Sequence, residues 1–324
     1  MAANSGDKAP RSSADVVRDW LDHGSPAGVR LGSPQTAGGL TLIPIFHAGP
    51  ELDYLTFADA QKQGSLQVTE LDEHGAVSAL AVENSSSLSV LLIDGEILIG
   101  LKQNRVLNTT ILVPPKTTLN VPVACVEAGR WRRTTARAAR ADYSLSPKIR
   151  ALKRHSVTLS ARAFGSFTAD QGAVWDGVAG HLGDLGVRSA TEAYSDIEKQ
   201  RRPEIEDRLA HFHPEPGQSG VVALLDGKPV AFDLFDRPST LAQLWQGLIG
   251  SYIAESLVPR ATDPSVDVNS VAQWIREAGA GGATSHPAVG LGETVLISGP
   301  EHDVSALVVE GVAVHIAAGP ALKL

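Results

Sequence analysis

The fold class is decided by residues 88–127, which read LSVLLIDGEILIGLKQNRVLNTTILVPPKTTLNVPVACVE. Four short apolar or alternating runs fill this stretch, with turn residues between them, at Leu88–Ile93, Ile97–Leu101, Val106–Val113 and Leu119–Val126. Runs of this length with such boundaries are typical of β-strands. Asp94-Gly95 predicts a hairpin between the first two runs, because an Asp-Gly pair tolerates the positive φ angles of a type I′ turn.

The strand pattern extends on the N-terminal side of this stretch and gives way to helices on the C-terminal side. Further runs of strand type lie at Leu40–Phe46, Leu66–Leu71 and Val77–Val82. In the second half, apolar residues at helical spacing predict helices over Asp170–Leu185, Thr240–Val258 and roughly Val268–Ala278.

Turn and capping residues complete the second half. Ser189 and Glu192 have the spacing of a capping box, which predicts a helix that ends at Pro203, where a further helix begins. Asp226-Gly227 and Glu310-Gly311 predict turns between short strands, and Pro229 predicts an edge strand or a bulge. We therefore expect an α+β fold, with an N-terminal antiparallel β-rich half (sandwich or barrel-like) followed by a mixed helical and β-hairpin half.

Composition divides the chain into three regions. Residues 1–30 read as a flexible tail with a short helix at Asp15–Leu21. Residues 31–165 are expected to form a β-rich domain that carries the stretch quoted above, and residues 166–324 an α+β region. The alternative is one continuous domain, with a sheet that crosses the midpoint of the chain.

The net charge of −8 over 324 residues argues against a main role in holding nucleic acid, because phosphate binding needs a surplus of Lys and Arg. The charge is uneven, since residues 130–154 contain nine basic residues and one acid, Asp142. The simplest interpretation of this basic segment is a solvated loop and helix. Nucleic acid is therefore not the partner we expect, although residues 130–154 leave it open.

The single cysteine, Cys125, rules out a disulfide within the chain and a zinc site with several cysteines. Met1–Ala14 lacks the apolar core of a signal peptide, and no apolar run approaches the ~18–20 residues of a membrane helix. The default expectation is a reducing cytoplasmic location without membrane contact. His211 and His213 resemble a metal-binding fragment, but the prolines around them favour a loop, so we expect no metal. The cofactor is unknown.

Matching the apolar faces of two predicted strands brings a cation and a carboxylate together. Setting Val113 opposite Leu119 across the Pro114-Pro115 turn places Arg105 opposite Glu127 at the open end of an apolar face. Directly opposed side chains have Cβ atoms ~4.5–5.5 Å apart, which is within reach of an ion pair. The sequence therefore predicts an Arg105–Glu127 pair.

Two interpretations of this cluster remain open. Nearby Lys102, Gln103, Arg130 and Trp131 could complete a pocket in which Arg and Lys hold an anion, Trp stacks, and Glu127 acts as a general base or accepts from a ribose hydroxyl. The alternative is a structural salt bridge at the edge of the sheet, with Trp131 in the core.

The same segment closely resembles the signature of a known family. The residues that carry the resemblance are Asp94-Gly95-Glu96, Gly100, Lys102-Gln103-Asn104-Arg105, Asn108-Thr109, Val123-Ala124-Cys125-Val126-Glu127 and Gly129-Arg130-Trp131. The family is the ARG- and rhodanese-phosphatase-associated protein domain (ARPP), in which ARG stands for ADP-ribosylglycohydrolase. Shorter matches continue downstream, so the resemblance spans roughly Leu40 to Leu257.

This family is uncharacterised and is named for its neighbours, enzymes that process ADP-ribose and phosphate groups. The resemblance implies a protein that handles a nucleotide- or ADP-ribose-related phosphorylated ligand, as a hydrolase or transferase, with ADP-ribose-processing enzymes as partners. The alternative is a non-catalytic interaction or scaffold module. The expected site comprises Glu127 as the catalytic residue and, as ligand-binding residues, Lys102, Gln103, Arg105, Asn108, Arg130 and Trp131.

Overall fold

The computed structural model describes residues 11–22, 28–72, 78–258 and 266–322. Within these ranges the helices are α1 (Ser13–Leu21), α2 (Phe57–Lys62), α3 (Pro147–Phe164), α4 (Gln171–Asp184), α5 (Ser195–Leu209), α6 (Pro238–Ser256) and α7 (Val268–Ala280). The strands of the first half are β1 (Arg30–Leu31), β2 (Gln35–Ala37), β3 (Leu40–Phe46), β4 (Tyr54–Thr56), β5 (Leu66–Thr69), β6 (Ala79–Asn84), β7 (Ser89–Leu92), β8 (Glu96–Ile99), β9 (Arg105–Leu107), β10 (Ile111–Val113), β11 (Thr117–Cys125) and β12 (Ala139–Ser144). Those of the second half are β13 (Gly220–Leu225), β14 (Lys228–Phe235), β15 (Gly282–Pro287), β16 (Glu293–Ser298), β17 (His302–Val309) and β18 (Val312–Pro320).

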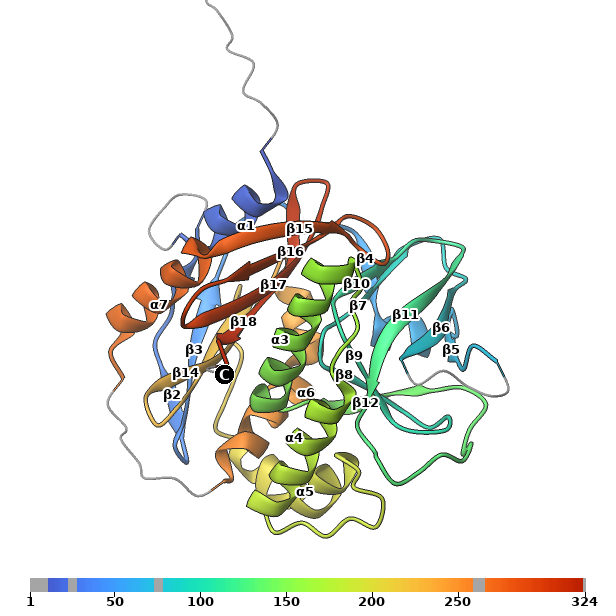
Figure 1. Cartoon of the computed structure of the whole chain (residues 1–324). Coiled ribbons are helices and arrows are strands. Elements are labelled where there is room, and N and C mark those ends of the chain that lie inside the picture. Colours follow the sequence, from blue (N-terminus) through green and yellow to red (C-terminus); the bar gives the residue numbers. More distant parts are fainter. Residues whose placement is uncertain (1–10, 23–27, 73–77, 259–265, 323–324) are drawn as a thin grey trace, which may run out of the picture.

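The largest sheet among the described residues joins both halves of the chain. Its strand order is β1-β3-β13-β14-β18-β17-β16-β15, with β2 also paired to β3. Strand β3 pairs antiparallel with β13 over six residues, so the sheet crosses the midpoint of the sequence. Figure 1 shows α1 and α7 beside this sheet on one side and α3 and α6 on the other.

Alternation along the strands explains why both faces of this sheet are covered. Side chains of a strand point alternately to the two faces. In β3, Ile43 and Ile45 contribute to the core beneath α1 and α7, whereas Leu40 and Leu42 contribute to the core beneath the other helices. A strand that is apolar at nearly every position therefore marks a central strand between two helical layers.

The N-terminal half also builds two smaller sheets, which lie together on the right of Figure 1. Their strand orders are β12-β8-β9-β11-β6-β5 and β10-β7-β4, and all their pairs are antiparallel except β4 with β7. Apolar side chains of both sheets enclose a core of their own, which includes Leu80, Leu98, Leu107 and Val121. The predicted α+β class, with a β-rich first half and a mixed second half, is confirmed.

The hairpin predicted at Asp94-Gly95 is wrong. The turn itself forms, since the backbone nitrogen of Glu96 donates to the carbonyl oxygen of Ile93 at 3.1 Å. However, β7 pairs with β4 and β10, whereas β8 pairs with β9 and β12, so the two strands belong to different sheets. Gly95 has a φ of +89° while Asp94 stays at negative φ. The turn is therefore not the type I′ turn that matches the twist of a hairpin.

The two other predicted turns are confirmed. Asp226 and Gly227 have φ angles of +49° and +77° and join β13 to β14, while Glu310 and Gly311, at +52° and +79°, join β17 to β18. Positive φ at both central residues is the signature of a type I′ turn. The register of β13 and β14 shifts next to Pro229. The bulge predicted there is present, and β18 pairs with this strand only from Phe232 to Phe235.

The helix boundaries predicted from Ser189 and Pro203 are wrong. Helix α5 begins only at Ser195 and continues through Pro203. The hydroxyl oxygen of Ser189 accepts from the backbone nitrogen of Ala193 at 2.8 Å, so it orders the loop before the helix instead of capping it. Proline lacks one backbone donor, and this helix tolerates that loss in its interior.

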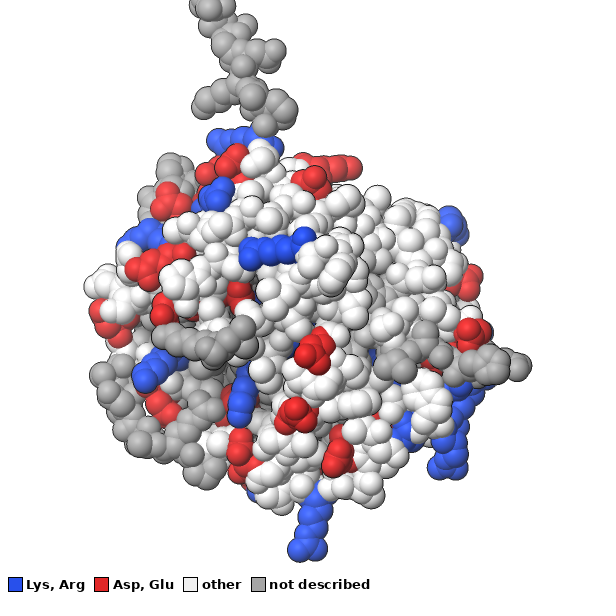
Figure 2. All heavy atoms as spheres, in the orientation of Figure 1, with Lys and Arg blue, Asp and Glu red and all other residues white. Residues whose placement is uncertain are grey.

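The surface above α3 carries few charged side chains, as Figure 2 shows for the face that α3 crosses in Figure 1. Helix α3 exposes two large apolar side chains, Leu159 and Phe164, with exposed fractions of 52% and 84%. In the ranges that the structure covers, no helix combines the length and the apolar character needed to cross a membrane.

Candidate functional site

Arg105 lies at the centre of the candidate site. It begins β9, which is flanked by β8 and β11, and its partners in the ladder are Leu98 on one side and Cys125 on the other. Opposed residues of an antiparallel pair share a face, so Arg105 points to the same side as these two buried side chains. As a result the arginine side chain is 0% exposed.

The predicted pairing of Arg105 with Glu127 is wrong by two residues. Strand β11 places Cys125, not Glu127, opposite Arg105. The prediction assumed one long strand that turned back at Pro114-Pro115. Instead, β10 leaves to pair with β7, and the first part of β11 pairs with β6. The proline turn therefore does not set the register. The predicted face of Arg105 is nevertheless right, because a shift of two residues preserves the alternation.

The guanidinium group of Arg105 is buried, and two of its three nitrogen atoms have no hydrogen-bond partner among the described residues. Nη1 donates to Oε1 of Gln103 at 3.0 Å. Nε and Nη2 have no hydrogen-bond partner among the residues that the structure describes. Burial lowers the pKa of Arg105, and the neighbouring Cys125 and Glu70 act in the opposite direction. A buried donor without an acceptor costs about 1–3 kcal/mol, which a bound acceptor would offset.

Trp131 lies against the same guanidinium group. The ring centroid of Trp131 is 5.5 Å from Cζ of Arg105 and 5.3 Å from Nζ of Lys102. The tryptophan is 47% exposed, whereas the arginine is fully buried. One aromatic side chain therefore contacts both the buried cation and the solvent, and it offers an apolar surface on which a planar group could stack.

Glu127 forms its ion pair with Arg130. Nε of Arg130 donates to Oε1 at 2.8 Å, and Nη2 donates to Oε2 at 2.6 Å. The hydroxyl group of Thr191 donates to Oε1 at 3.0 Å, and the backbone nitrogen of Asn104 donates to Oε2 at 3.2 Å. Burial would raise the pKa of Glu127, but the bonds from Arg130 and Asn104 outweigh it and lower the pKa below its ordinary value. Both oxygen atoms are thus occupied by protein donors.

The other donors of Arg130 are occupied as well. Nη1 donates to the carbonyl oxygens of Leu101 and Arg132 at 2.9 and 3.0 Å, and Nη2 also donates to Oδ1 of Asn104 at 3.2 Å. The Glu127–Arg130 pair therefore ties the loop that carries Lys102 to the segment that carries Trp131.

The remaining predicted residues divide between two places. Gln103 supports Arg105 and donates from Nε2 to the carbonyl oxygen of Ala128 at 3.4 Å. Asn108 instead contacts α3 and the segment after it: Nδ2 donates to the backbone carbonyl oxygen of Phe167 at 3.0 Å, and the backbone carbonyl oxygen of Asn108 accepts from Lys153 at 2.9 Å. The structure thus brings together Lys102, Gln103, Arg105, Glu127, Arg130 and Trp131 and places Asn108 apart from them.

Sequence reasoning missed Glu70, which belongs to the same site. This residue directly follows β5, and Oε1 accepts from the backbone nitrogen of Lys102 at 3.0 Å. Its side chain is 7% exposed, and Oε2 has no hydrogen-bond partner in the described part of the chain. The charge of Glu70 acts on both Arg105 and Cys125. In the sequence, Glu70 is one of three acids within four residues at the end of a strand (Glu70, Asp72 and Glu73), and only the fold brings it beside Arg105.

A second polar cluster, also missed, lies between α3 and the large sheet. Asp233 of β14 accepts two hydrogen bonds from Arg150, at 3.0 and 2.7 Å, and one from the hydroxyl group of Tyr252. Nε2 of His315 lies 3.1 Å from Oδ1 of Asp233. Burial would raise the pKa of Asp233, but Arg150 and His315 outweigh it and hold the pKa well below its ordinary range. The carboxylate stays ionised inside the protein.

Asp94 supplies the second carboxylate of this cluster. It pairs with Lys153, and Oδ2 lies 3.8 Å from Nη2 of Arg150 and 3.7 Å from Nη2 of Arg154. Burial would raise the pKa of Asp94, but the three cations lower it, with Lys153 first. Burial in turn lowers the pKa of Lys153 despite the opposing effect of Asp94. Three cations of one helix thus share two buried carboxylates.

The interpretation of residues 130–154 as a solvated segment is wrong for its C-terminal part. Arg132, Arg133 and Arg137 are exposed, whereas Arg150, Lys153 and Arg154 are buried. Residues three and four apart lie on one face of a helix, so α3 turns its three cations toward the interior. The carboxylates that neutralise them come from distant strands and turns, which a local charge count does not reveal.

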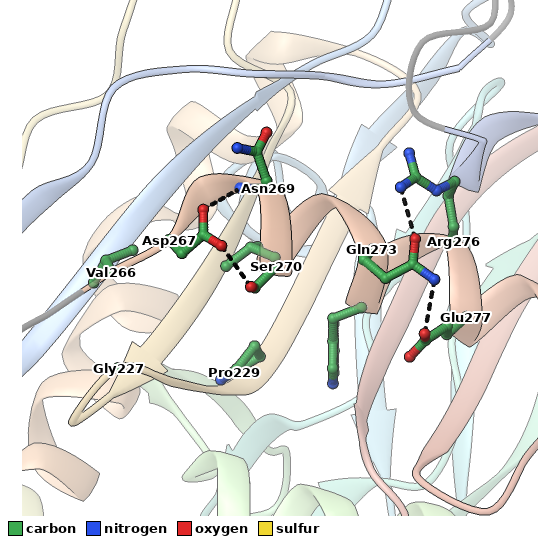
Figure 3. A pocket seen from close by; sticks show the side chains of 11 residues that line it. Gly227, Pro229, Val266, Asp267, Asn269, Ser270, Gln273, Arg276 and Glu277 are labelled. Carbon is green, nitrogen blue, oxygen red and sulfur yellow. Dashed lines mark hydrogen bonds between the residues drawn. The ribbon is translucent and has the colours of Figure 1, made fainter.

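A separate hollow of ≈ 870 Å³ lies between α7 and the β13–β14 turn (Figure 3). Its polar side chains satisfy one another: Asp267 accepts from Ser270 at 2.6 Å, and Gln273 bonds to Arg276 and Glu277 at 2.7 and 2.8 Å. The hollow shares no lining residue with the Arg105 site. Within the described ranges, no group of three or more His, Cys, Asp or Glu side chains is placed to hold a metal ion.

Comparison with known proteins agrees with the resemblance in the signature segment. Residues 28–318 match the model of the ARG and Rhodanese-Phosphatase-superfamily-associated Protein domain, ARPP-1. The chain belongs to this family. The match extends well beyond the signature residues and covers nearly the whole chain. No curated protein and no solved structure shows a significant match to the chain. The name ARPP-1 is loosely compatible with the handling of phosphate groups and specifies no reaction.

Proposed function

We propose that this chain binds a phosphorylated, nucleotide-like ligand of the ADP-ribose class, with a phosphate group on Arg105 and a base against Trp131. One observation carries the proposal: Nε and Nη2 of the buried Arg105 lack partners among the described residues. These two atoms form the edge of a guanidinium group that binds a carboxylate or phosphate group through two parallel bonds. Arg130 uses the same two atoms to bind Glu127.

Charge and shape around Arg105 support the same ligand class. Lys102 places a second cation at the ring of Trp131, which favours an anionic ligand over a neutral one. The half-exposed tryptophan supplies a flat apolar surface for a base. The same proposal includes a reaction of the hydrolase or transferase type, which takes place in a reducing cytoplasm together with ADP-ribose-processing enzymes. These parts of the proposal follow from the family association.

The catalytic role of Glu127 stays a prediction, and its contacts support a different role. Four hydrogen bonds from Arg130, Thr191 and Asn104 occupy both oxygen atoms. A general base needs a free lone pair within reach of the proton that it removes. We therefore assign Glu127 and Arg130 to positioning the loop around Lys102 and Trp131.

Isothermal titration calorimetry of the full chain with ADP-ribose, ADP and inorganic phosphate tests the proposal. We expect Arg105→Gln to weaken binding of these phosphorylated ligands by about 10- to 150-fold, because a hydrogen bond to a charged group contributes about 1.5–3 kcal/mol. Circular dichroism confirms that the variant is folded before the titration is interpreted.

Arg133→Gln is the matched control. It also removes one positive charge, but from the basic segment 130–154, and its side chain is exposed to solvent. Screening by salt confines the effect of such a charge to a Debye length of about 8 Å at 0.15 M, so the affinity should be nearly unchanged. The proposal fails if the wild-type chain binds none of the three ligands, or if both variants weaken binding equally.

A second candidate function is a non-catalytic interaction module. The mutual saturation of Glu127 and Arg130 favours it, because those two residues act as a structural clamp. This function predicts no calorimetric response of the wild-type chain to any of the three ligands. It also predicts that Glu127→Gln lowers stability through the loss of the clamp, which thermal unfolding measures.

A further inference from the structure

Two carboxylates border the guanidinium group of Arg105, and they differ in how their oxygen atoms are used. Glu127 has both oxygens bonded to protein donors. Glu70 has one oxygen bonded to the backbone nitrogen of Lys102 and the other buried without a partner among the residues described. Glu70 is therefore the carboxylate of this site that still has an acceptor to offer.

The contact with Lys102 also fixes the direction of the unused oxygen. Oε1 of Glu70 is held at 3.0 Å from the backbone nitrogen of Lys102, in the loop that the Glu127–Arg130 pair clamps in place. With one oxygen held, rotation of the carboxylate is restricted. Oε2 is thus presented in a defined direction, at a side chain that is only 7% exposed.

The unused atoms of Glu70 and Arg105 complement each other. Among the described residues, the donor atoms Nε and Nη2 of Arg105 and the acceptor atom Oε2 of Glu70 have no hydrogen-bond partner, and the charge of Glu70 acts on Arg105. Neither an ion pair nor a hydrogen bond joins the two side chains in the described part of the chain, so one ligand can contact both. A fully ionised phosphate group on Arg105 only accepts hydrogen bonds, and it would leave Glu70 unmatched. A hydroxyl group of the same ligand can donate a hydrogen bond to Glu70.

We infer that Glu70 is a specificity-determining residue that accepts a hydrogen bond from a ribose hydroxyl group of the ligand. The site would then select phosphorylated ligands that carry free sugar hydroxyls, such as nucleoside diphosphates and ADP-ribose, over phosphate alone. This inference rests on the proposed function, and it moves the hydroxyl-accepting role that the sequence suggested for Glu127 to Glu70.

The test compares ADP with 2′,3′-dideoxyadenosine diphosphate, which keeps both phosphates and the base but lacks the two hydroxyls. Calorimetry on the wild-type chain should give at least about tenfold tighter binding of ADP, the size of one hydrogen bond to a charged acceptor. Glu70→Gln replaces the free acceptor by a donor at constant shape. It should remove the preference for ADP and leave the affinity for the dideoxy compound and for inorganic phosphate equal or higher.

Glu83→Gln is the control, because Glu83 lies on the adjacent strand β6 with an exposed side chain. It should retain the tenfold preference. The ratio of the wild-type affinities for ADP and for the dideoxy compound tests the inference even if Glu70→Gln does not fold. Equal binding of both nucleotides by the wild-type chain overturns the inference.

The two ways of failing are distinguishable. If Arg105→Gln weakens both nucleotides but Glu70→Gln leaves their ratio unchanged, the inference about Glu70 is overturned while the proposed function stands. If the wild-type chain binds neither nucleotide, the proposed function fails, and the inference fails with it.

Discussion

Asp233→Asn removes one negative charge from the interior at almost constant shape. Asp233 is 0% exposed, and after the change the carboxylate that remains beside Arg150 among the described residues is Asp94 at 3.8 Å, which Lys153 and Arg154 already share. Removing one partner of a buried ion pair costs about 3–5 kcal/mol. Because a folded protein is stable by only about 5–15 kcal/mol, we expect the variant to lose a large part of its stability.

Urea unfolding at pH 7, followed by circular dichroism, measures this loss. With an m-value of about 3 kcal/mol/M, the midpoint should fall by about 1 M or more. Asp142→Asn is the control, because Asp142 forms an exposed ion pair with Arg202 at 3.1 Å, and exposed pairs contribute only about 0–1 kcal/mol. Equal midpoints for the two variants would refute the claim that the buried cluster stabilises the fold.

The pH dependence gives an independent check of the same cluster. The folded-state pKa of Asp233 lies below its ordinary value because Arg150 and His315 outweigh the effect of burial. The stability that the ionised carboxylate contributes is therefore complete above the ordinary pKa of about 3.9 and is lost as the pH falls toward the folded-state pKa. The difference between wild type and Asp233→Asn should be constant from pH 6 to 8 and shrink below about pH 4.

Two further predictions concern stability. Burial raises the pKa of Glu198 to about 7, so the folded state keeps a proton that the unfolded state releases near pH 4.3, and the stability of the wild type falls as the pH rises from about 4 to 7. Urea unfolding should therefore show that Glu198→Gln is more stable than the wild type at pH 8, by up to about 3 kcal/mol, and equal to it at pH 4. A Cβ on Gly129 would lie 2.9 Å from Cα of Thr191, whereas one on Gly180 in α4 meets nothing within 4 Å. Gly129→Ala should therefore lower the melting temperature, and Gly180→Ala should raise stability by about 0.5–1 kcal/mol; the opposite order would contradict the backbone contact.

Local sequence patterns were sufficient for most of the secondary structure. The predicted run Leu40–Phe46 coincides with β3, and the turns at Asp226-Gly227 and Glu310-Gly311 join paired strands as expected. These features depend on residues close in sequence, such as alternating apolar side chains and residues that accept positive φ. The inward face of Arg105 was predicted for the same reason, because alternation along a strand is local.

The features that sequence reasoning missed depend on partners distant along the chain. Arg150 binds a carboxylate 83 residues away, and Lys153 one that is 59 residues away. The predicted pairing of Arg105 with Glu127 was wrong because β10 pairs with β7 rather than with β11. The hydrogen bond that holds one oxygen of Glu70 comes from the backbone nitrogen of Lys102, which is 32 residues away. Such contacts leave no periodic signal in the sequence.

The buried cluster between α3 and the large sheet has a consequence for synthesis on the ribosome. Arg150 is made 83 residues before Asp233, which at about 5–20 residues per second is an interval of roughly 4–17 s. His315, on the last strand, follows Asp233 by a further 82 residues. Until then the nascent chain holds charged residues that have no complete set of partners, so its interior can close only after β18 has emerged. A cut between α3 and β14 would place Arg150 and Asp233 on different fragments, and neither fragment is expected to fold alone.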